Sequence, residues 1–499
     1  MGILVFFFFL LFFPFALIFR LRKTQKTKKI NPPPSPPGLP LIGNMHQFDG
    51  AKPYEGLRKL SNKYGPLMLL KLGKRQVLVI SSAKMAKQAL KTHDLVFSGR
   101  PPLVVMQKVS YNGKDITFST YGDYWREMKK LSVIHLFTQK RVQQFRPILD
   151  DGISSMIKEI SNLASSSQVV NLTSMATNLA STYICRIAFG KKFNKEDQER
   201  KRFDPILREH QLIYAEFFVT DYLPSLSWID KIMGKFARLD NNVKELSSFF
   251  QELIDDHLDP NRPETMKNDI LDLLIQMKED KTSSFDFTWD HIKAVLTDVF
   301  VAGTDTSSAL IIWAMTTLMQ NPSAMKKVQA EIRDVFDKKG GQWDEVLQEL
   351  PYFDAVIKET IRLYPPTPVN LPRETIGSCN IDGWDIEPNT MVIFNAWAIA
   401  RDPESWPNPD SFIPERFLNS SIDIKGNDFE LIPFGAGRRQ CPGMALGLST
   451  TRVTLANLLY SFDWKLPSGV KIADIDTDAF PGATMHKRNP LYLMATKYA

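Results

Sequence analysis

The chain of 499 residues is 43% hydrophobic and 23% charged, a composition typical of a folded body with a large buried core. Its three cysteines, Cys185, Cys379 and Cys441, are too few for a disulfide framework, so a reducing compartment is expected. The net charge of +7 comes almost wholly from a cluster of basic residues between Arg20 and Lys29, which argues against a nucleic-acid-binding surface.

The N-terminal residues 1–19 carry no charge and consist mainly of Phe, Leu and Ile. As a helix they would span about 28 Å, close to the hydrocarbon thickness of a bilayer. Because the basic cluster follows directly, the positive-inside rule predicts a retained transmembrane anchor with the body in the cytosol. A cleaved secretory signal, the alternative, would carry its basic residues before the apolar run. Residues 20–40 form a predicted stalk, basic at first and then proline-rich, which would be a stiff spacer before a domain at 41–499.

The remainder of the chain predicts one mainly α domain with a smaller β portion. Leu67 to Ser82, with Gly73-Lys74 at its centre, predicts a β-hairpin. Helices are predicted, among others, at 83–91, 143–163, 243–258 and 324–338. A β-like pattern returns between 376 and 392, and the prolines from 365 to 414 predict mostly ordered loop.

A long apolar helix is predicted from about His291 to Gln320, and the string Ala302-Gly303-Thr304-Asp305-Thr306 interrupts it. A glycine inside a helix costs about 1 kcal/mol relative to alanine, and an acid and a hydroxyl are awkward in a packed core. In an isolated helix these residues would form a polar kink satisfied by backbone carbonyls. Next to a cofactor they would instead supply a groove, an acid and a hydroxyl.

Three further charged residues can form a triad. Glu359 and Arg362 stand three positions apart, so a helix would place them on one face. Arg416, in the string Pro-Glu-Arg-Phe, can join them. Such pairs also occur by chance on protein surfaces, so these three residues alone do not indicate a function.

The segment PFGAGRRQCPG, residues 433–443, precedes an apolar run that can form a helix. Its glycines allow positive φ and close approach, so that backbone N–H groups can point at the Cys441 sulfur. The N-terminus of the next helix favours thiolate over thiol. Phe434 can shield the sulfur from water, and Arg439 can reach an anionic cofactor group. A lone cysteine is usually a buried structural thiol, and zinc is disfavoured because no second Cys or His lies at ligand spacing.

This segment resembles the cysteine-ligand loop of the cytochrome P450 family in its plant microsomal, A-type form, and the resemblance extends from Pro32 to Tyr498. It implies a triangular helical body around haem b, with Cys441 as the thiolate ligand of the iron. Phe434, Gly437 and Arg439 would lie beside the cofactor.

The resemblance also assigns roles outside this loop. The triad of Glu359, Arg362 and Arg416 would be structural and would support the haem face. In the long helix, Gly303 would open a groove for dioxygen. Thr306 would hydrogen-bond the dioxygen, and Asp305 would help to relay protons.

Haem-propionate partners follow the family pattern less closely. The string Trp125-Arg126-Glu127-Met128-Lys129 resembles the family's Trp-x-x-x-Arg clamp, with Lys129 in the arginine position. Lysine still pairs with a carboxylate but lacks the planar fork, so Arg126 is a second candidate for the role. Arg373 is a further candidate partner. A surface salt bridge is the alternative in each case.

The implied activity is that of a monooxygenase, which inserts one atom of dioxygen into a small apolar molecule and reduces the other to water. Electrons would come from a separate NADPH–cytochrome P450 reductase, because no G-x-G-x-x-G fingerprint follows a strand. The reductase would dock on the face that carries Arg438 and Arg439. The expected location is the endoplasmic reticulum membrane, with residues 41–499 as the haem-thiolate catalytic domain facing the cytosol.

Two alternatives were open, a haem-thiolate isomerase or dehydratase without external electrons and a non-catalytic haem sensor. The intact Asp305-Thr306 pair disfavours both. Within the family, strings such as 258–263 and 395–397 most resemble the subgroup that oxidises aldoximes in glucosinolate synthesis, while a terpenoid, phenolic or alkaloid scaffold is an equal expectation. Resemblance places five segments over the haem as determinants of substrate choice: Pro101–Thr117, Leu207–Phe218, Ala294–Ala302, Thr367–Leu371 and Ala479–Met485.

Overall fold

The computed structural model describes residues 30–191, 198–263, 268–341 and 343–498. The predicted anchor at 1–19 and the basic part of the stalk lie outside the described residues. Within them, the α-helices are α2 (Pro53–Tyr64), α3 (Ala83–Lys87), α4 (Val104–Val109), α5 (Asp123–Leu136), α6 (Gln139–Gln144), α7 (Arg146–Ser165), α8 (Leu172–Phe189), α9 (Gln198–Tyr214), α10 (Val219–Tyr222), α11 (Ser227–Ile232), α12 (Lys235–Leu258), α13 (Ile270–Glu279), α14 (Trp289–Gln320), α15 (Pro322–Lys338), α16 (Trp343–Val346), α17 (Pro351–Leu363), α18 (Ala396–Ile399) and α19 (Met444–Ser461).

The strands of the same described ranges are short. They are β1 (Leu67–Leu72), β2 (Arg75–Ile80), β3 (Val170–Asn171), β4 (Arg373–Glu374), β5 (Cys379–Ile381), β6 (Trp384–Ile386), β7 (Met391–Phe394), β8 (Phe462–Lys465) and β9 (Tyr492–Lys497). The mainly α fold with a smaller β portion is therefore confirmed.

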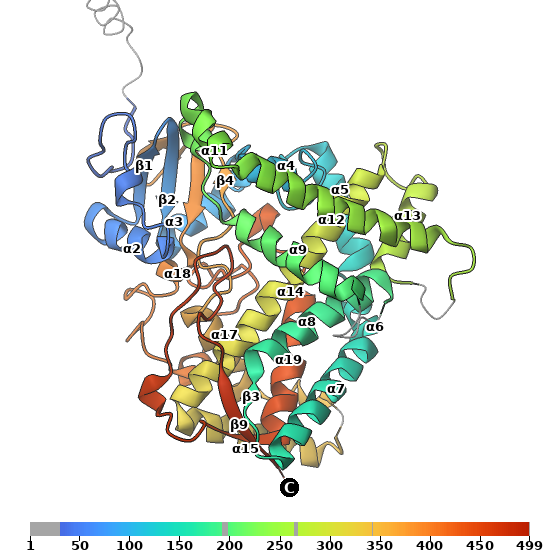
Figure 1. Cartoon of the computed structure of the whole chain (residues 1–499). Coiled ribbons are helices and arrows are strands. Elements are labelled where there is room, and N and C mark those ends of the chain that lie inside the picture. The colour runs from blue at the N-terminus through green and yellow to red at the C-terminus, as the bar shows by residue number, and fades with distance from the viewer. Residues whose placement is uncertain (1–29, 192–197, 264–267, 342, 499) are drawn as a thin grey trace, which may run out of the picture.

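Helix α14 is the axis of the helical body (Figure 1). It packs against α8, α19, α17 and α15, because apolar side chains surround it on all sides and such a helix is stable only when buried. It is long and apolar enough to cross a membrane, yet 67% of its most apolar window is buried inside the protein. The predicted helix from His291 to Gln320 is confirmed, and it belongs to the core.

The largest sheet lies to one side of the helical body, with strand order β1-β2-β7-β4 (Figure 1). The predicted hairpin is confirmed: Leu67 pairs with Ile80 and Leu72 with Arg75, so Gly73 and Lys74 form the turn. Strand β7 adds parallel to β2. The predicted β-like stretch at 376–392 contains β5, β6 and the start of β7.

The proline-rich segment is extended, as predicted, but it is not a free spacer. The backbone N–H of Leu69 donates to the carbonyl of Pro34 (2.9 Å), and the Asn44 amide donates to that of Pro36 (3.0 Å). Because proline offers no N–H, its carbonyls are the groups available for docking. The later prolines of the predicted stalk therefore contact the folded body, and the stalk boundary at residue 40 stays a prediction.

Candidate functional site

Cys441 lies in a tight loop directly before α19. A short 3-10 turn at Gly437–Arg439 leads into it, and its N–H donates to the Phe434 carbonyl (2.9 Å). Burial raises the pKa of the Cys441 thiol, whereas the N–H of Gly443 and the charge of Lys129 act in the opposite direction. The N–H expected from the helix N-terminus is therefore present, and a metal ion at the sulfur would displace its proton.

Asp94, which was not among the predicted site residues, fixes the start of this loop. Its carboxylate accepts from the backbone N–H of Arg438 (3.1 Å) and pairs with the same residue's guanidinium (3.1 Å). Gly437 has φ +68°, and a β-carbon there would overlap Asp94 and the Leu90 carbonyl. Glycine is required at this position for both its conformation and the close approach.

Three buried arginines gather beside the loop: Arg373 and Arg439, which were predicted, and Arg100, which was not. Burial lowers the pKa of Arg100 to about 10, of Arg373 to about 9 and of Arg439 to about 8, and the latter two are lowered further by neighbouring guanidinium groups. They donate to backbone carbonyls, including Ala436 from Arg373 (2.8 Å) and Ser119 from Arg439 (2.6 Å). Among the described residues none of them forms an ion pair with a carboxylate.

Trp125 and Lys129 of α5 lie on this cluster. The guanidinium of Arg439 stands 4.2 Å from the centre of the Trp125 ring, while the indole N–H donates to the Ile116 carbonyl (2.9 Å). Lys129 donates to the carbonyl of Arg438, and burial followed by the charges of neighbouring arginines lowers its pKa to about 8. Both residues therefore face the Cys441 loop.

Arg126 is placed elsewhere, and its candidacy as a propionate partner is corrected. Its side chain is 59% exposed and pairs with Asp123 on the outer face of α5. Trp125 and Lys129 stand four positions apart and share the inward face of α5, whereas Arg126 follows Trp125 directly and is turned about 100° away from it. Of the two candidates, only Lys129 points inward.

The predicted triad is assembled in the core. Arg362 donates to both carboxylate oxygens of Glu359 (2.7 and 2.9 Å), and Arg416 donates to one of them (3.0 Å). The remaining N–H groups of Arg362 bond to carbonyls such as that of Ala400 (2.8 Å). A buried charge is tolerated only when it is paired and hydrogen-bonded in this way.

The polar string of α14 forms an accessible stripe in the middle of a buried helix. Ala302 is exposed, and Asp305 and Thr306 are half-buried, while residues on the other faces of the same turns are buried. Thr306 donates to the Ala302 carbonyl (2.7 Å), and Asp305 pairs with His486 (3.1 Å). These side chains are therefore accessible, although the helix that carries them is mostly buried.

Helix α19 connects the Cys441 loop with the polar stripe of α14. Its Gly447 lies against Ser307 of α14, where a β-carbon would stand 3.8 Å from the serine oxygen. Since Cys441 ends the loop that enters α19 and Ser307 follows Thr306, the thiol and the polar stripe belong to one region of the molecule.

Four of the five segments predicted to select the substrate meet in two apolar clusters. Val105 and Val109 share one apolar cluster with Ile213 and Phe218, and Leu371 packs against it. Met485 joins Trp313 of α14 in a second cluster, where Val369 lies at the edge. The segment 367–371 therefore contacts both clusters.

Two buried carboxylates that sequence reasoning missed lie between these segments. Asp298 of α14 accepts from the Ile116 N–H (2.9 Å), and Asp115 accepts from the N–H groups of Phe118 and Ser119 (2.9 and 2.8 Å). Burial raises the pKa of Asp298 to about 6 and raises that of Asp115 well above its ordinary value. Asp298 therefore fastens the segment at Ile116 to α14, whereas Asp115 closes the turn at 115–119 within the segment itself.

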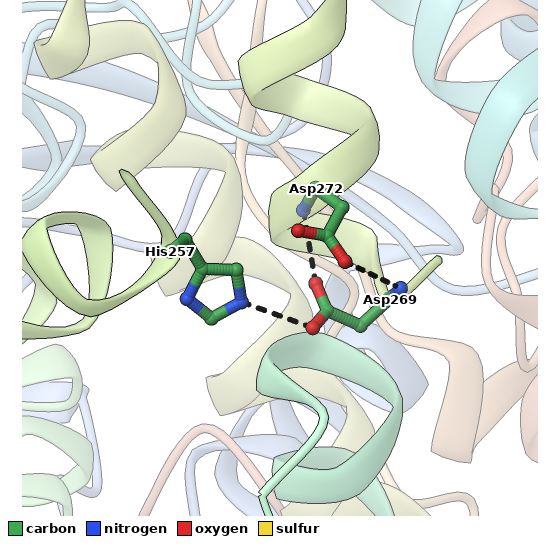
Figure 2. A group of neighbouring side chains, drawn as sticks. All are labelled: His257, Asp269 and Asp272. Atoms are coloured by element: carbon green, nitrogen blue, oxygen red, sulfur yellow. Dashed lines mark hydrogen bonds and ion pairs between the residues drawn. The ribbon is translucent and has the colours of Figure 1, made fainter. Parts of the chain in front are cut away.

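A separate cluster of His257, Asp269 and Asp272 has a spacing that could hold a metal ion (Figure 2). Arg262, however, bonds to both carboxylates, at 2.6 Å to Asp269. The His257 ring lies between the Leu253 carbonyl (2.7 Å) and Asp269 (2.9 Å). The Arg262 guanidinium already pairs with both acids, so this cluster joins α12 to α13 and is not a candidate metal site.

The residues around Cys441 fit a haem. The three buried guanidinium groups form no direct ion pair and donate to backbone carbonyls, and the two propionates of a flat cofactor would give them charged acceptors. The sulfur of Cys441 offers the axial ligand, and the open stripe of α14 faces the same region. Fold and site together define a helical haem-thiolate protein.

Comparison with known proteins agrees. The family model described as Cytochrome P450 matches residues 33–494, and the chain belongs to the cytochrome P450 family. It is 45% identical to 6,7,8-trihydroxycoumarin synthase of Pastinaca sativa, with 99% of each chain covered. It is 43% identical to strychnine-11-hydroxylase of Strychnos nux-vomica (96% and 95% covered) and 42% identical to a phenylacetaldehyde oxime monooxygenase of Prunus mume (98% and 93% covered).

Solved structures show the same architecture. A zebrafish cytochrome P450 in a structure with progesterone has a TM-score of 0.75 and 25% identity, covering 89% of this chain and 99% of that one. The protein is therefore a plant-type cytochrome P450 monooxygenase with haem b as cofactor and NADPH used through a reductase. The isomerase and sensor alternatives find no support, because the relatives carry the names of hydroxylases, synthases and monooxygenases.

Proposed function

We propose that this monooxygenase oxidises a planar aromatic plant metabolite of the coumarin class, with Cys441 as the haem ligand and Asp305 and Thr306 as the proton-handling pair. The observation that carries the proposal is the convergence of three unpaired buried arginines, the Cys441 loop and the accessible stripe of α14. Relatives named for trihydroxycoumarin, 5-OH-xanthotoxin and xanthotoxol support the substrate class.

When bound, the haem supplies the iron that activates dioxygen. Arg373, Arg439 and Arg100 hold the propionates, with Lys129 and Trp125 beside them, and Phe434 keeps water from the thiolate. The triad of Glu359, Arg362 and Arg416 keeps the supporting loops in place.

On the opposite side, the residues of α14 handle protons. The Thr306 hydroxyl gives its hydrogen to the Ala302 carbonyl, so its lone pairs are free to accept a hydrogen bond. Asp305 can take up a proton at its carboxylate and return it, which suits general acid–base work. The apolar segments around residues 105, 213 and 485 exclude water and orient the substrate.

The proposed membrane face combines the N-terminal segment with α10 and α11. Leu41 is 87% exposed and Ile232 is 77% exposed, with Trp228 and Met233 also exposed beside it on the chain. The β1–β2 turn links the two parts, since Gly73 donates to the Ile42 carbonyl (3.1 Å) and Lys74 donates to the Tyr222 carbonyl (2.8 Å). A contiguous exposed apolar surface fits a lipid interface. We therefore place this face on the endoplasmic reticulum membrane, next to the anchor at 1–19.

The membrane proposal has a direct test. An Ile232→Cys variant that carries an environment-sensitive fluorophore should show a blue shift when the full chain is placed in lipid vesicles. Lys338→Cys on α15, at the other end of the body in Figure 1, should show none. Equal responses would contradict this orientation.

The proposed reductase face lies outside the Cys441 loop. Arg438 donates to the Tyr121 hydroxyl (3.2 Å), and Arg126 bonds to the same tyrosine, so both cations flank one exposed patch. An acidic flavoprotein surface would be steered to it. Arg126→Glu should slow reduction by the reductase and should reduce its dependence on salt, while the haem spectrum stays unchanged.

Substrate class is tested by the spin-state shift of the purified haem protein. Coumarins and furanocoumarins should convert the low-spin Soret band to high spin at micromolar concentration. Strychnos-type alkaloids and arylacetaldoximes are tested in parallel as alternative substrate classes. If only one of these two classes, and no coumarin, shifts the spin state, that class replaces the coumarins as the proposed substrate. The reduced carbon-monoxide complex must show the red-shifted band of a thiolate ligand, and Cys441→Ala must abolish it.

A further inference from the structure

The carboxylate of Asp305 has a specific partner from the far end of the chain. The Nε2 atom of His486 lies 3.1 Å from Oδ1 of Asp305. The Asp305 side chain is 15% exposed, and that of His486 is 34% exposed. Among the described residues this is the one ion pair that either of them forms. The acid of the polar stripe is therefore linked to a second titratable group that is more accessible than itself.

The fold holds His486 firmly against α14. The indole N–H of Trp313 donates to the Met485 carbonyl (2.7 Å), and the Met485 N–H donates to the Pro366 carbonyl (2.8 Å). On the other side, the His486 carbonyl accepts from the Phe480 N–H (2.8 Å). The backbone on both sides of the imidazole is thus fixed, and the contact with Asp305 does not depend on a free loop.

The other charged groups near this histidine are engaged elsewhere. Lys487 is buried and pairs with Asp476 (2.8 Å). The guanidinium of Arg488 lies 6.0 Å from the centre of the Phe480 ring. Asp478 contacts Lys52 (3.5 Å). Within the described part of the chain, Asp305 is therefore the carboxylate that contacts the His486 ring.

The chemistry of the contact fixes the direction of proton movement. A carboxylate can only accept, so Nε2 of His486 carries the hydrogen that faces Asp305. An imidazolium can pass this proton to Oδ1 and take up another at Nδ1 from water.

We propose that His486 is a positioning residue for Asp305 and supplies it with protons from solvent; this rests on the proposed monooxygenase function. One proton leaves Nε2 and enters Oδ1, so the imidazolium becomes neutral imidazole and the carboxylate becomes the acid. The acid then passes that proton to the Thr306 hydroxyl, which releases its own hydrogen toward the substrate side, and the imidazole is protonated again by water. No electron is transferred in the relay, and the net change is one proton moved from solvent, through Thr306, to the substrate side of α14.

The experiment uses the full-length haem protein with NADPH–cytochrome P450 reductase, without substrate. The fraction of consumed NADPH that appears as hydrogen peroxide is measured between pH 6 and 8.5. In the wild type this fraction should rise as imidazole loses its proton, because proton delivery fails. His486→Gln should raise it several-fold at pH 6.5 and make it independent of pH, while His486→Lys, which stays charged, should keep it low up to pH 8.5. The matched control is His46→Gln at an exposed histidine, which should follow the wild type.

A purely structural role predicts a different pattern. If His486 only anchors its loop, the single variants lower the melting temperature but keep the wild-type pH profile, and that profile would overturn the proposal. A wild-type profile that is flat would overturn it as well. The double variant Asp305→Asn/His486→Gln should lose no more thermal stability than the larger single loss, because the two groups act as a pair. Failure of the wild type to consume NADPH, despite a normal thiolate carbon-monoxide band, would instead refute the proposed function.

Discussion

Gly303 of α14 faces Ile184 of α8 so closely that a β-carbon on the glycine would lie 2.5 Å from the isoleucine Cδ1. The resemblance to the family explains this glycine by a groove for dioxygen. The structure adds a packing reason, because α14 and α8 form the most extensive helix contact of the described fold. Close packing against α8 therefore requires a glycine at position 303, in addition to any role of this residue in the site.

Gly303→Ala should destabilise the protein by roughly 1–3 kcal/mol through overpacking, offset by about 1 kcal/mol of helix propensity. Ile184→Val should restore part of the loss, since it removes the methyl group in the way. Thermal unfolding measures both. Gly447→Ala is the control, because its β-carbon would meet Ser307 at an ordinary 3.8 Å, and it should be neutral or stabilising.

Glu359→Gln should cost about 3–5 kcal/mol, because it leaves the Arg362 guanidinium buried without its counter-charge. The expected result is low haem content and a large fall in melting temperature. Asp334→Asn is the matched control on the exposed pair with Lys338 (2.6 Å), and it should cost less than about 0.5 kcal/mol. Similar effects of the two variants would contradict the structural role of the triad.

Arg373→Gln and Arg439→Gln should each weaken haem retention by about tenfold or more, since a hydrogen bond to a charged group contributes roughly 1.5–3 kcal/mol. Transfer of haem to apomyoglobin measures the loss. Arg126→Gln should leave the transfer rate unchanged, because this side chain lies on the surface. Faster transfer from Arg126→Gln than from Lys129→Gln would show that the inward-facing residue had been assigned wrongly.

Asp298 should make stability depend on pH in an unusual direction. Burial raises its pKa to about 6, so between pH 4 and 6 the folded state keeps a proton that the unfolded state releases. Stability from this group therefore falls as pH rises through that window, by roughly 2–3 kcal/mol in all. Asp298→Asn should reduce this slope, as measured by urea unfolding from pH 4.5 to 7, and Asp115, whose pKa is also raised by burial, should account for the part that remains. Exposed Asp334→Asn should keep it.

Local sequence patterns predicted much of the molecule. The hairpin at 67–80, the long apolar helix and the glycine-rich Cys441 loop each depend on residues close together in the chain, and each was found where expected. The pair of Glu359 and Arg362 was predicted for the same reason, because helical spacing alone brings them together. The family resemblance then fixed haem b and the monooxygenase class.

Contacts between distant segments could not be predicted in this way. Asp94 bonds to Arg438, Arg100 joins Arg439, and Asp305 meets His486, although each pair is separated by more than 150 residues. Charge alone did not show whether Arg126 or Lys129 faces the cofactor. In the structure Arg126 lies on the outer face of α5, and Lys129 points toward the Cys441 loop. By itself the sequence determined the hairpin, the long apolar helix and the haem monooxygenase class, because the motifs that indicate them consist of residues at short spacings. Only the tertiary structure decided which cations lie beside the Cys441 loop and which group meets the Asp305 carboxylate, because burial and pairing arise when remote segments pack together.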